Sequence, residues 1–327
     1  MVRVTTAGAH GVGGAADPDQ IPSRNTTIAI SHDIPNEEAL AFVSMPTAET
    51  ALYASARVSN DPIAAQLQAR LTSTGKEPGV PTDDAVTYKR VEGEAFRTKD
   101  GRTVDPTVAD VDQGGLGDCY LMGAMAAVAK TDPNLLRNMI SKNDDGTYTV
   151  RLRVKEGGKW KTVPVNVTPT FPHNSDGKHS YADPTPGNQN NTLWPALIEK
   201  AYAQYKGGYD KIEGGNSGRA MELITGRSSR NTSIGSTTDP NDIYDKVKAA
   251  ERGGHPMTLS TKDGATDYPG DHAYAVLGAV ERDGKKYIRI YNPWGVNDGS
   301  RKLEDSIYEV PLDKLRANFD SLKINDA

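Results

Sequence analysis

The chain has 327 residues, a length that allows one large domain or two smaller ones and argues against a mini-scaffold. Its 38 basic and 43 acidic side chains give a net charge of −5 without a long basic run, so nucleic acid and anionic membranes are not expected partners. Hydrophobic residues make up 36%, and together with the 32 glycines they are sufficient for a buried core.

The sequence shows no targeting signal of a standard type. The stretch after Met1 lacks the continuous apolar segment of a secretory signal peptide, and no run approaches the roughly 18 apolar residues of a membrane span. We therefore expect a soluble protein, either cytoplasmic or exported without a standard signal. The pattern determines neither the compartment nor the oligomeric state.

The N-terminal part differs in composition from the rest. Its first 35 or so residues are mostly small and polar, which predicts disorder, and short helical patterns follow over Thr47–Val58 and Asp61–Leu71. A Pro/Gly-rich segment, Lys76–Pro81, then interrupts both helix and strand patterns. We expect a boundary near residue 80, with residues 1–80 forming a dispensable leader and residues 81–327 forming the core domain.

The core pattern predicts helices first and most strands later. Asp118–Lys130 is apolar almost all round, which indicates a buried helix, and two further helices are expected over Leu193–Tyr205 and Asn241–Glu251. Alternating apolar and polar residues predict two hairpins, which pair Thr147–Lys155 with Trp160–Val167 and His272–Val280 with Tyr287–Tyr291. This order favours the α+β class over alternating βαβ units.

The single cysteine, Cys119, lies at the start of the predicted buried helix and cannot form an internal disulfide. Free cysteines are often inert buried residues. A helix N-terminus and a nearby imidazole can instead lower a thiol pKa, which would make Cys119 a nucleophile at neutral pH.

Three other residues favour the nucleophile reading. Gln113 precedes the thiol across a glycine-rich loop and could supply an N–H to an oxyanion hole. His272 begins one strand of the second predicted hairpin, and Asn292 follows the other. Adjacent antiparallel strands would bring the two side chains together, with Asn292 orienting His272 as a base.

Four ordered motifs, within about residues 85–327, resemble the calpain family of cysteine proteases. They are Gln113-Gly-Gly-Leu-Gly-Asp-Cys119, Leu193-Trp-Pro-Ala-Leu-Ile-Glu-Lys-Ala-Tyr202 with Gly214-Gly215, His272-Ala-Tyr-Ala-Val276 and Asn292-Pro-Trp-Gly295. The resemblance implies a papain-like α+β fold, in which a helical subdomain and a β-rich subdomain flank an active-site cleft. It gives Gln113, Cys119, His272 and Asn292 the oxyanion, nucleophile, base and orienting roles, and Trp294 would shield the His–Asn hydrogen bond.

The sequence also departs from the family pattern. Tyr120 stands where a tryptophan is usual, Asp271 replaces a glycine, and the stretch after Trp294 is shortened. That stretch contributes to a calcium site in animal calpains, so we expect no obligatory cofactor, with calcium as an optional ligand. Candidate carboxylate ligands are Asp118, Glu199, Asp298, Glu304 and Asp305.

These features together predict a cysteine endopeptidase that hydrolyses protein or peptide substrates through a thioester acyl-enzyme. A transglutaminase-like acyl transferase would use the same thiol chemistry. A catalytically idle binding protein with a papain-like fold is the remaining alternative. The sequence does not specify the substrate.

Overall fold

The computed structural model describes residues 77–80, 86–184, 192–295 and 303–326. All of them belong to one compact unit that spans residues 70–327. The two helices expected before residue 72 lie outside the described residues. Within the described part of the chain, no helix is long and apolar enough to cross a membrane.

The three longest described helices correspond to the three predicted from the apolar pattern. Proline in the first turn of two of them fits a position where the missing N–H costs nothing, and Gly207 ends one in a left-handed conformation with φ of 105°. The α-helices are α3 (Cys119–Thr131), α4 (Pro133–Met139), α5 (Trp194–Lys206), α6 (Ser217–Thr225), α7 (Pro240–Arg252) and α8 (Leu312–Asn318). Short 3₁₀ turns are η1 (Val108–Asp110), η3 (Tyr209–Lys211) and η4 (Leu303–Ser306).

The principal sheet has six strands in the order β12-β11-β10-β9-β13-β8, and its described pairings are antiparallel. Its strands are β8 (Ser229–Ser233), β9 (Met257–Thr261), β10 (Ala273–Arg282), β11 (Lys285–Tyr291), β12 (Ile307–Pro311) and β13 (Phe319–Asn325). Three smaller sheets contain β1 (Thr87–Arg90) with β7 (Thr170–His173), β2 (Thr98–Lys99) with β3 (Arg102–Thr103), and β4 (Ile140–Lys142) with β5 (Tyr148–Glu156) and β6 (Lys159–Val167). Both predicted hairpins form, as β5–β6 and β10–β11, and the α+β class is confirmed.

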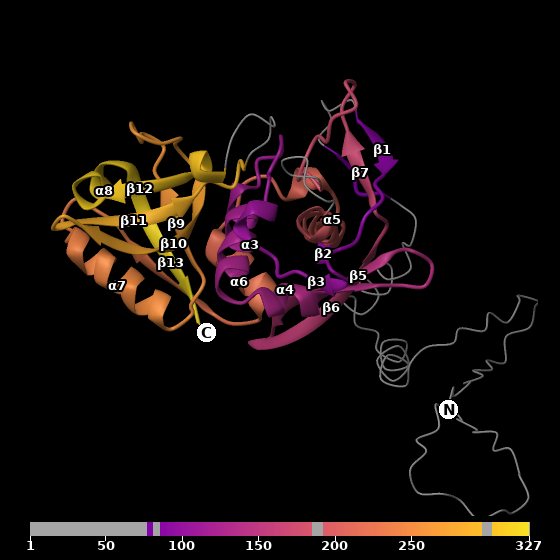
Figure 1. Ribbon diagram of the computed structural model, residues 1–327, viewed down its shortest axis with the longest axis horizontal. Coiled ribbons are helices and arrows are strands. Elements are labelled where there is room, and N and C mark those ends of the chain that lie inside the picture. Colours follow the sequence, from indigo (N-terminus) through magenta and orange to yellow (C-terminus); the bar gives the residue numbers. More distant parts are fainter. Residues whose placement is uncertain (1–76, 81–85, 185–191, 296–302, 327) are drawn as a thin grey trace, which may run out of the picture. The chain divides into compact units, whose positions relative to one another are not determined.

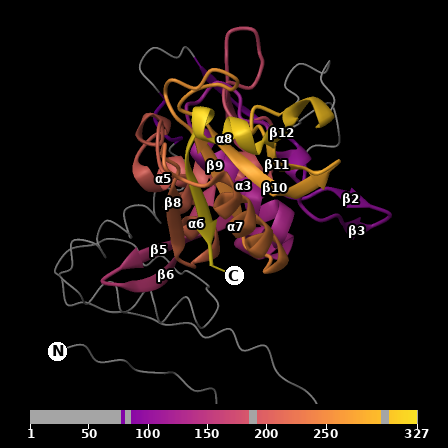
Figure 2. The same ribbon diagram turned by 90° about the vertical axis from the view of Figure 1, so that its left-hand side faces the viewer.

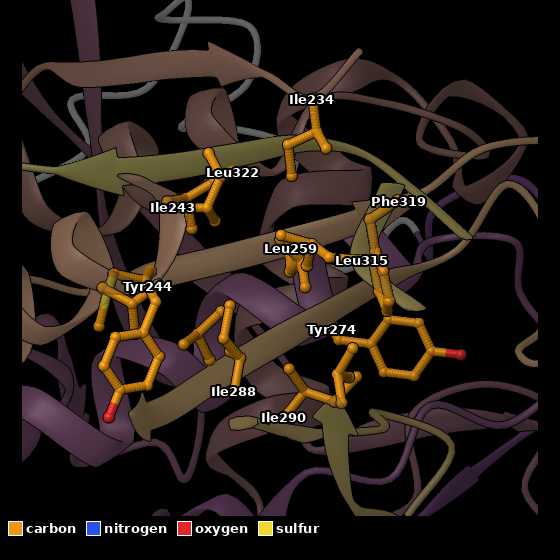
Figure 3. Packing of buried hydrophobic residues seen from close by; sticks show 14 of the residues in the cluster. Ile234, Ile243, Tyr244, Leu259, Tyr274, Ile288, Ile290, Leu315, Phe319 and Leu322 are labelled. Atoms are coloured by element: carbon orange, nitrogen blue, oxygen red, sulfur yellow. The ribbon is translucent and has the colours of Figure 1, made fainter. Parts of the chain in front are cut away.

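The six-stranded sheet has an apolar core on one face. Ile243 and Tyr244 of α7 pack with Leu259, Tyr274 and Ile288 of the strands in a fully buried cluster (Figure 3). The side of the molecule that carries α7, α8 and this sheet faces the viewer in Figure 2. Burial of this cluster fixes which way the alternating side chains of β10 point, because a shift of one residue would turn the apolar set away from α7.

The opposite face of β10 lies against α3 (Figure 1). Gly123 allows the close approach, since a Cβ there would lie 3.1 Å from the carbonyl oxygen of Ala273. Cys119 is four residues before Gly123 and therefore lies on the same face of the helix. The sequence thus directs the thiol toward the start of β10.

The segment before β1 is bound to the core. Gly79 accepts a hydrogen bond of 2.6 Å from the backbone N–H of Tyr209, and Pro78 accepts one from the hydroxyl of Tyr88. Glu77 forms an ion pair with the buried ammonium of Lys200 on α5. The boundary expected near residue 80 stays a prediction, but these contacts favour a position before Glu77.

Candidate active site

Cys119 is the first residue of α3 and is partly exposed. The backbone N–H groups of Ala273 and Tyr120 face its sulfur, and both lower the thiol pKa. Burial raises the pKa more than they lower it, and the carboxylates of Asp118 and Asp271 raise it further. The pKa of Cys119 is therefore above its ordinary value, opposite to the direction expected from the helix N-terminus.

His272 and Asn292 lie together, as the hairpin pattern predicted. His272 immediately precedes β10 and Asn292 immediately follows β11, and the imidazole Nε2 is 2.7 Å from the amide Oδ1. The backbone N–H of Trp294 also donates to this Oδ1, which identifies the atom as an oxygen. Nε2 of His272 must then be the donor, so the neutral ring keeps its lone pair on Nδ1.

Aromatic rings surround this pair. The ring centroids of His272 and Trp294 are 4.6 Å apart, and Tyr274 meets the imidazole edge-on at 4.8 Å. Trp294 is 38% exposed and is the one large hydrophobic side chain exposed in the described ranges. Burial lowers the pKa of His272, although the hydrogen bond with Asn292 opposes this shift.

The structure connects the Gln113 loop to the Asn292 turn. The backbone N–H of Gln113 donates to the carbonyl of Pro293 at 3.0 Å, and the hydroxyl of Tyr291 donates to the carbonyl of Val111 at 2.7 Å. The side-chain Nε2 of Gln113 donates to the carbonyl of Leu116 at 2.5 Å. One of its two N–H groups is thus used within the loop, and the oxyanion role stays a prediction.

The thiol and the imidazole form no direct hydrogen bond in the described structure. Cys119 instead faces the backbone N–H of Ala273, the residue that follows His272. Nδ1 of His272 has no hydrogen-bond partner among the described residues, whereas Nε2 is held by Asn292. Nδ1 is therefore the ring atom left to receive a proton.

Tyr120 makes contacts that the sequence did not indicate. Its hydroxyl donates to the carbonyl of Ile212 at 3.0 Å, and a Cβ on Gly215 would lie 2.4 Å from its ring. The backbone N–H of Gly214 also donates to the carbonyl of Gly117 at 2.8 Å. The glycine pair therefore runs beside the nucleophile loop, and glycine is required at position 215. The sequence marked Tyr120 as a departure from the usual tryptophan, but it did not indicate that Ile212 would accept the hydrogen bond of its hydroxyl.

Of the carboxylates considered for calcium, the four that the structure describes do not form a single cluster. Asp118 and Glu199 are fully buried, Glu304 and Asp305 are exposed on η4, and Asp298 lies outside the described residues. Over the described ranges, no group of three or more His, Cys, Asp or Glu side chains could hold a metal ion. Calcium binding stays a prediction.

Comparison with known proteins gives the family. The model of the calpain family of cysteine proteases matches residues 67–309. The chain is 30% identical over 204 residues to the calpain-type cysteine protease DEK1 of Arabidopsis thaliana, and 32% identical over 220 residues to the calpain-1 catalytic subunit of Mus musculus. Calpain-B of Drosophila melanogaster is 32% identical over 242 residues.

These alignments cover 58%, 62% and 64% of this chain but only 9%, 30% and 25% of the respective relatives. The fold and the match over most of the core define a cysteine-protease domain of mixed α+β structure. The chain belongs to the calpain family.

Proposed function

We propose that this protein is a cysteine endopeptidase that hydrolyses peptide bonds of protein substrates through a thioester acyl-enzyme. The observation that carries the proposal is the hydrogen bond of 2.7 Å between His272 and Asn292, at the point where β10 meets the helix of Cys119. Family membership supports the same reaction class.

The electrostatics support proton transfer during attack. Burial raises the pKa of Cys119 and lowers the pKa of His272, so both groups are neutral in the resting site. As the sulfur of Cys119 bonds to the substrate carbonyl carbon, Nδ1 of His272 takes the thiol proton and the carbonyl π electrons move to oxygen. Asn292 keeps the ring in the tautomer that this step needs.

The acyl-enzyme forms when the C–N bond breaks and His272 returns the proton to the leaving amine. A water molecule then adds to the thioester, again giving its proton to His272, and the carboxylic acid product leaves as the thiol is restored. The backbone N–H of Cys119 and the second side-chain N–H of Gln113 are the candidate donors to the oxyanion of each tetrahedral intermediate.

The decisive test is Cys119→Ala, assayed by release of peptide fragments from unfolded casein. Proteolysis should be abolished, since loss of the nucleophile costs several orders of magnitude. Circular dichroism should show an unchanged fold, because the substitution removes one sulfur at a helix N-terminus. Residual cleavage within about tenfold of wild type would contradict the assignment.

A parallel assay separates hydrolysis from acyl transfer. Wild-type protein is incubated with casein and a fluorescent primary amine, and both fragment release and amine incorporation are measured. We expect fragments with little incorporation. Incorporation without fragments would instead support the transglutaminase-like alternative, and neither product would support the binding-protein alternative.

A further inference from the structure

A buried tyrosine joins the strand that ends before Asn292 to the loop that leads to Gln113. Tyr291 is the last residue of β11 and is 0% exposed, and its hydroxyl donates to the backbone carbonyl of Val111 at 2.7 Å. Val111 is also 0% exposed, so bulk water does not reach this hydrogen bond. The bond therefore links two segments that are 180 residues apart in the chain.

The position of the Tyr291 side chain is fixed by the six-stranded sheet. Its backbone pairs with Ala275 of β10 and with Ile307 of β12, so the residue has a strand on each side. The preceding residue, Ile290, belongs to the apolar cluster that packs against α7. Because successive side chains of a strand alternate between faces, Tyr291 lies on the other face, where β10 contacts α3.

The hydroxyl of Tyr291 stays a hydrogen-bond donor near neutral pH. Burial is the largest effect that raises its pKa, and the carboxylates of Asp112 and Asp110 raise it further. The ionised phenolate, which could only accept a hydrogen bond, is therefore disfavoured. The bond to Val111 thus does not titrate in the pH range of the proposed reaction.

A second contact continues the link toward the candidate oxyanion donors. The backbone N–H of Gln113 donates to the carbonyl of Pro293 at 3.0 Å, two residues further along both segments. A Cβ on Gly295 would lie 2.9 Å from the carbonyl oxygen of Val111, so glycine allows the turn to approach the loop closely. The loop before α3 and the turn after β11 are therefore packed against each other.

We infer that Tyr291 is a positioning residue that holds the Gln113 loop in place relative to His272 and Asn292. This role rests on the proposed function. The Gln113 loop precedes α3, whereas His272 and Asn292 flank the β10–β11 hairpin, so their relative placement depends on contacts between the loop and the sheet. Tyr291 supplies such a contact from the interior, and because it is fully buried it does not touch the substrate.

Tyr291→Phe removes the hydroxyl and keeps the ring. We expect kcat for casein to fall by about tenfold or more while KM changes less, because small displacements of a catalytic group are costly. The matched control is Tyr148→Phe on β5, which also loses a buried hydroxyl, here one that donates to the carbonyl of Gly93 at 3.2 Å. The control should keep the kcat of the wild type. An unchanged kcat in Tyr291→Phe would overturn the inference.

Two reactions of Cys119 separate positioning of the oxyanion donors from general loosening of the site. Alkylation by iodoacetamide needs the thiolate but no oxyanion donor, so its rate in Tyr291→Phe should match the wild type within about twofold. A peptide aldehyde instead forms a tetrahedral adduct, in which the sulfur bonds to the carbonyl carbon and the thiol proton moves to the oxygen. Its affinity should fall by about the same factor as kcat/KM. Slower alkylation, or an unchanged affinity for the aldehyde, would overturn the inference.

Rescue tests the hydrogen bond itself. Replacement of Tyr291 by 4-aminophenylalanine keeps an N–H that can donate to the carbonyl of Val111, and it should restore kcat to within about threefold of the wild type. A kcat as low as that of Tyr291→Phe would overturn the inference.

A double variant tests whether Tyr291 acts through the loop. Tyr291→Phe combined with Gln113→Ala should lose no more activity than Gln113→Ala alone, because both changes affect the same donor. Additive losses would overturn action through Gln113.

The failure of this inference and the failure of the proposed function give different results. A wild type that cleaves no casein would refute both. A wild type that cleaves casein, with an equal kcat in Tyr291→Phe, would overturn the role of Tyr291 alone. A Tyr291→Phe chain that does not fold would show that the hydroxyl holds the fold, and this result would also overturn a positioning role.

Discussion

Removal of residues 77–80 should destabilise the core severely. The side chain of Lys200 is 1% exposed, and its ammonium donates to the carbonyl and hydroxyl oxygens of Thr168 and Thr170. Its ion-pair partner is Glu77. A chain that begins at residue 81 lacks this carboxylate and also lacks Gly79, the acceptor for the backbone N–H of Tyr209.

The expected cost follows from these two losses. A buried ion pair that loses one partner costs about 3–5 kcal/mol, and an unsatisfied buried N–H costs about 1–3 kcal/mol. The total of about 4–8 kcal/mol is comparable with the whole free energy of unfolding of a typical domain, about 5–15 kcal/mol. We therefore predict that residues 77–80 are needed for stability. Only residues 1–69, which precede the compact unit, are then expected to be dispensable.

The cost should depend on pH. Burial lowers the pKa of Lys200 to about 8, and loss of Glu77 would lower it further. Because the unfolded lysine stays charged up to about pH 10.4, deprotonation of folded Lys200 relieves the buried charge as pH rises. The loss in free energy of unfolding caused by removing residues 77–80 should therefore be smaller at pH 9 than at pH 6.

Urea unfolding of the full chain, residues 70–327 and residues 81–327, at pH 6 and pH 9, measures both effects. The full chain and residues 70–327 should have the same free energy of unfolding, whereas residues 81–327 should be mostly unfolded at pH 6. A free energy of unfolding for residues 81–327 within about 1 kcal/mol of the longer chains would refute the reasoning.

Three further predictions concern the candidate site. Asn292→Ala should lower kcat but leave more activity than His272→Ala, since Asn292 orients the ring and His272 transfers the proton; equal loss in two folded variants would contradict these roles. Because burial lowers the pKa of His272, the acid limb of the pH profile of kcat/KM should have its midpoint below about pH 6.5. The free energy of unfolding should also fall as pH drops through the pKa of folded His272. An acid limb with its midpoint above about pH 6.5 would contradict a lowered pKa for His272. Casein cleavage should persist in excess EGTA with at most modest stimulation by calcium, and activity that disappears in chelator and returns with calcium would overturn this expectation.

Local patterns in the sequence determined the parts of the site that depend on short-range structure. An apolar run with no polar face predicted the buried helix α3 and placed Cys119 at its start. Strand alternation around Asp283 and Gly284, which take positive φ of 52° and 70°, predicted the β10–β11 hairpin. The pairing of His272 with Asn292 followed, because a hairpin fixes which residues lie side by side.

Only the tertiary structure decided the electrostatics and the polar contacts between distant segments. Strand β13 was not predicted, because its buried polar residues Ser321 and Lys323 hide the apolar alternation that marks a strand. The hydrogen bond from Tyr120 to Ile212 and the ion pair of Glu77 with Lys200 join segments far apart in the chain, and a polar residue carries no periodic signal of its partner. The raised pKa of Cys119 was also not predictable from local sequence. It results mainly from desolvation, which depends on the atoms that surround the thiol in the folded protein.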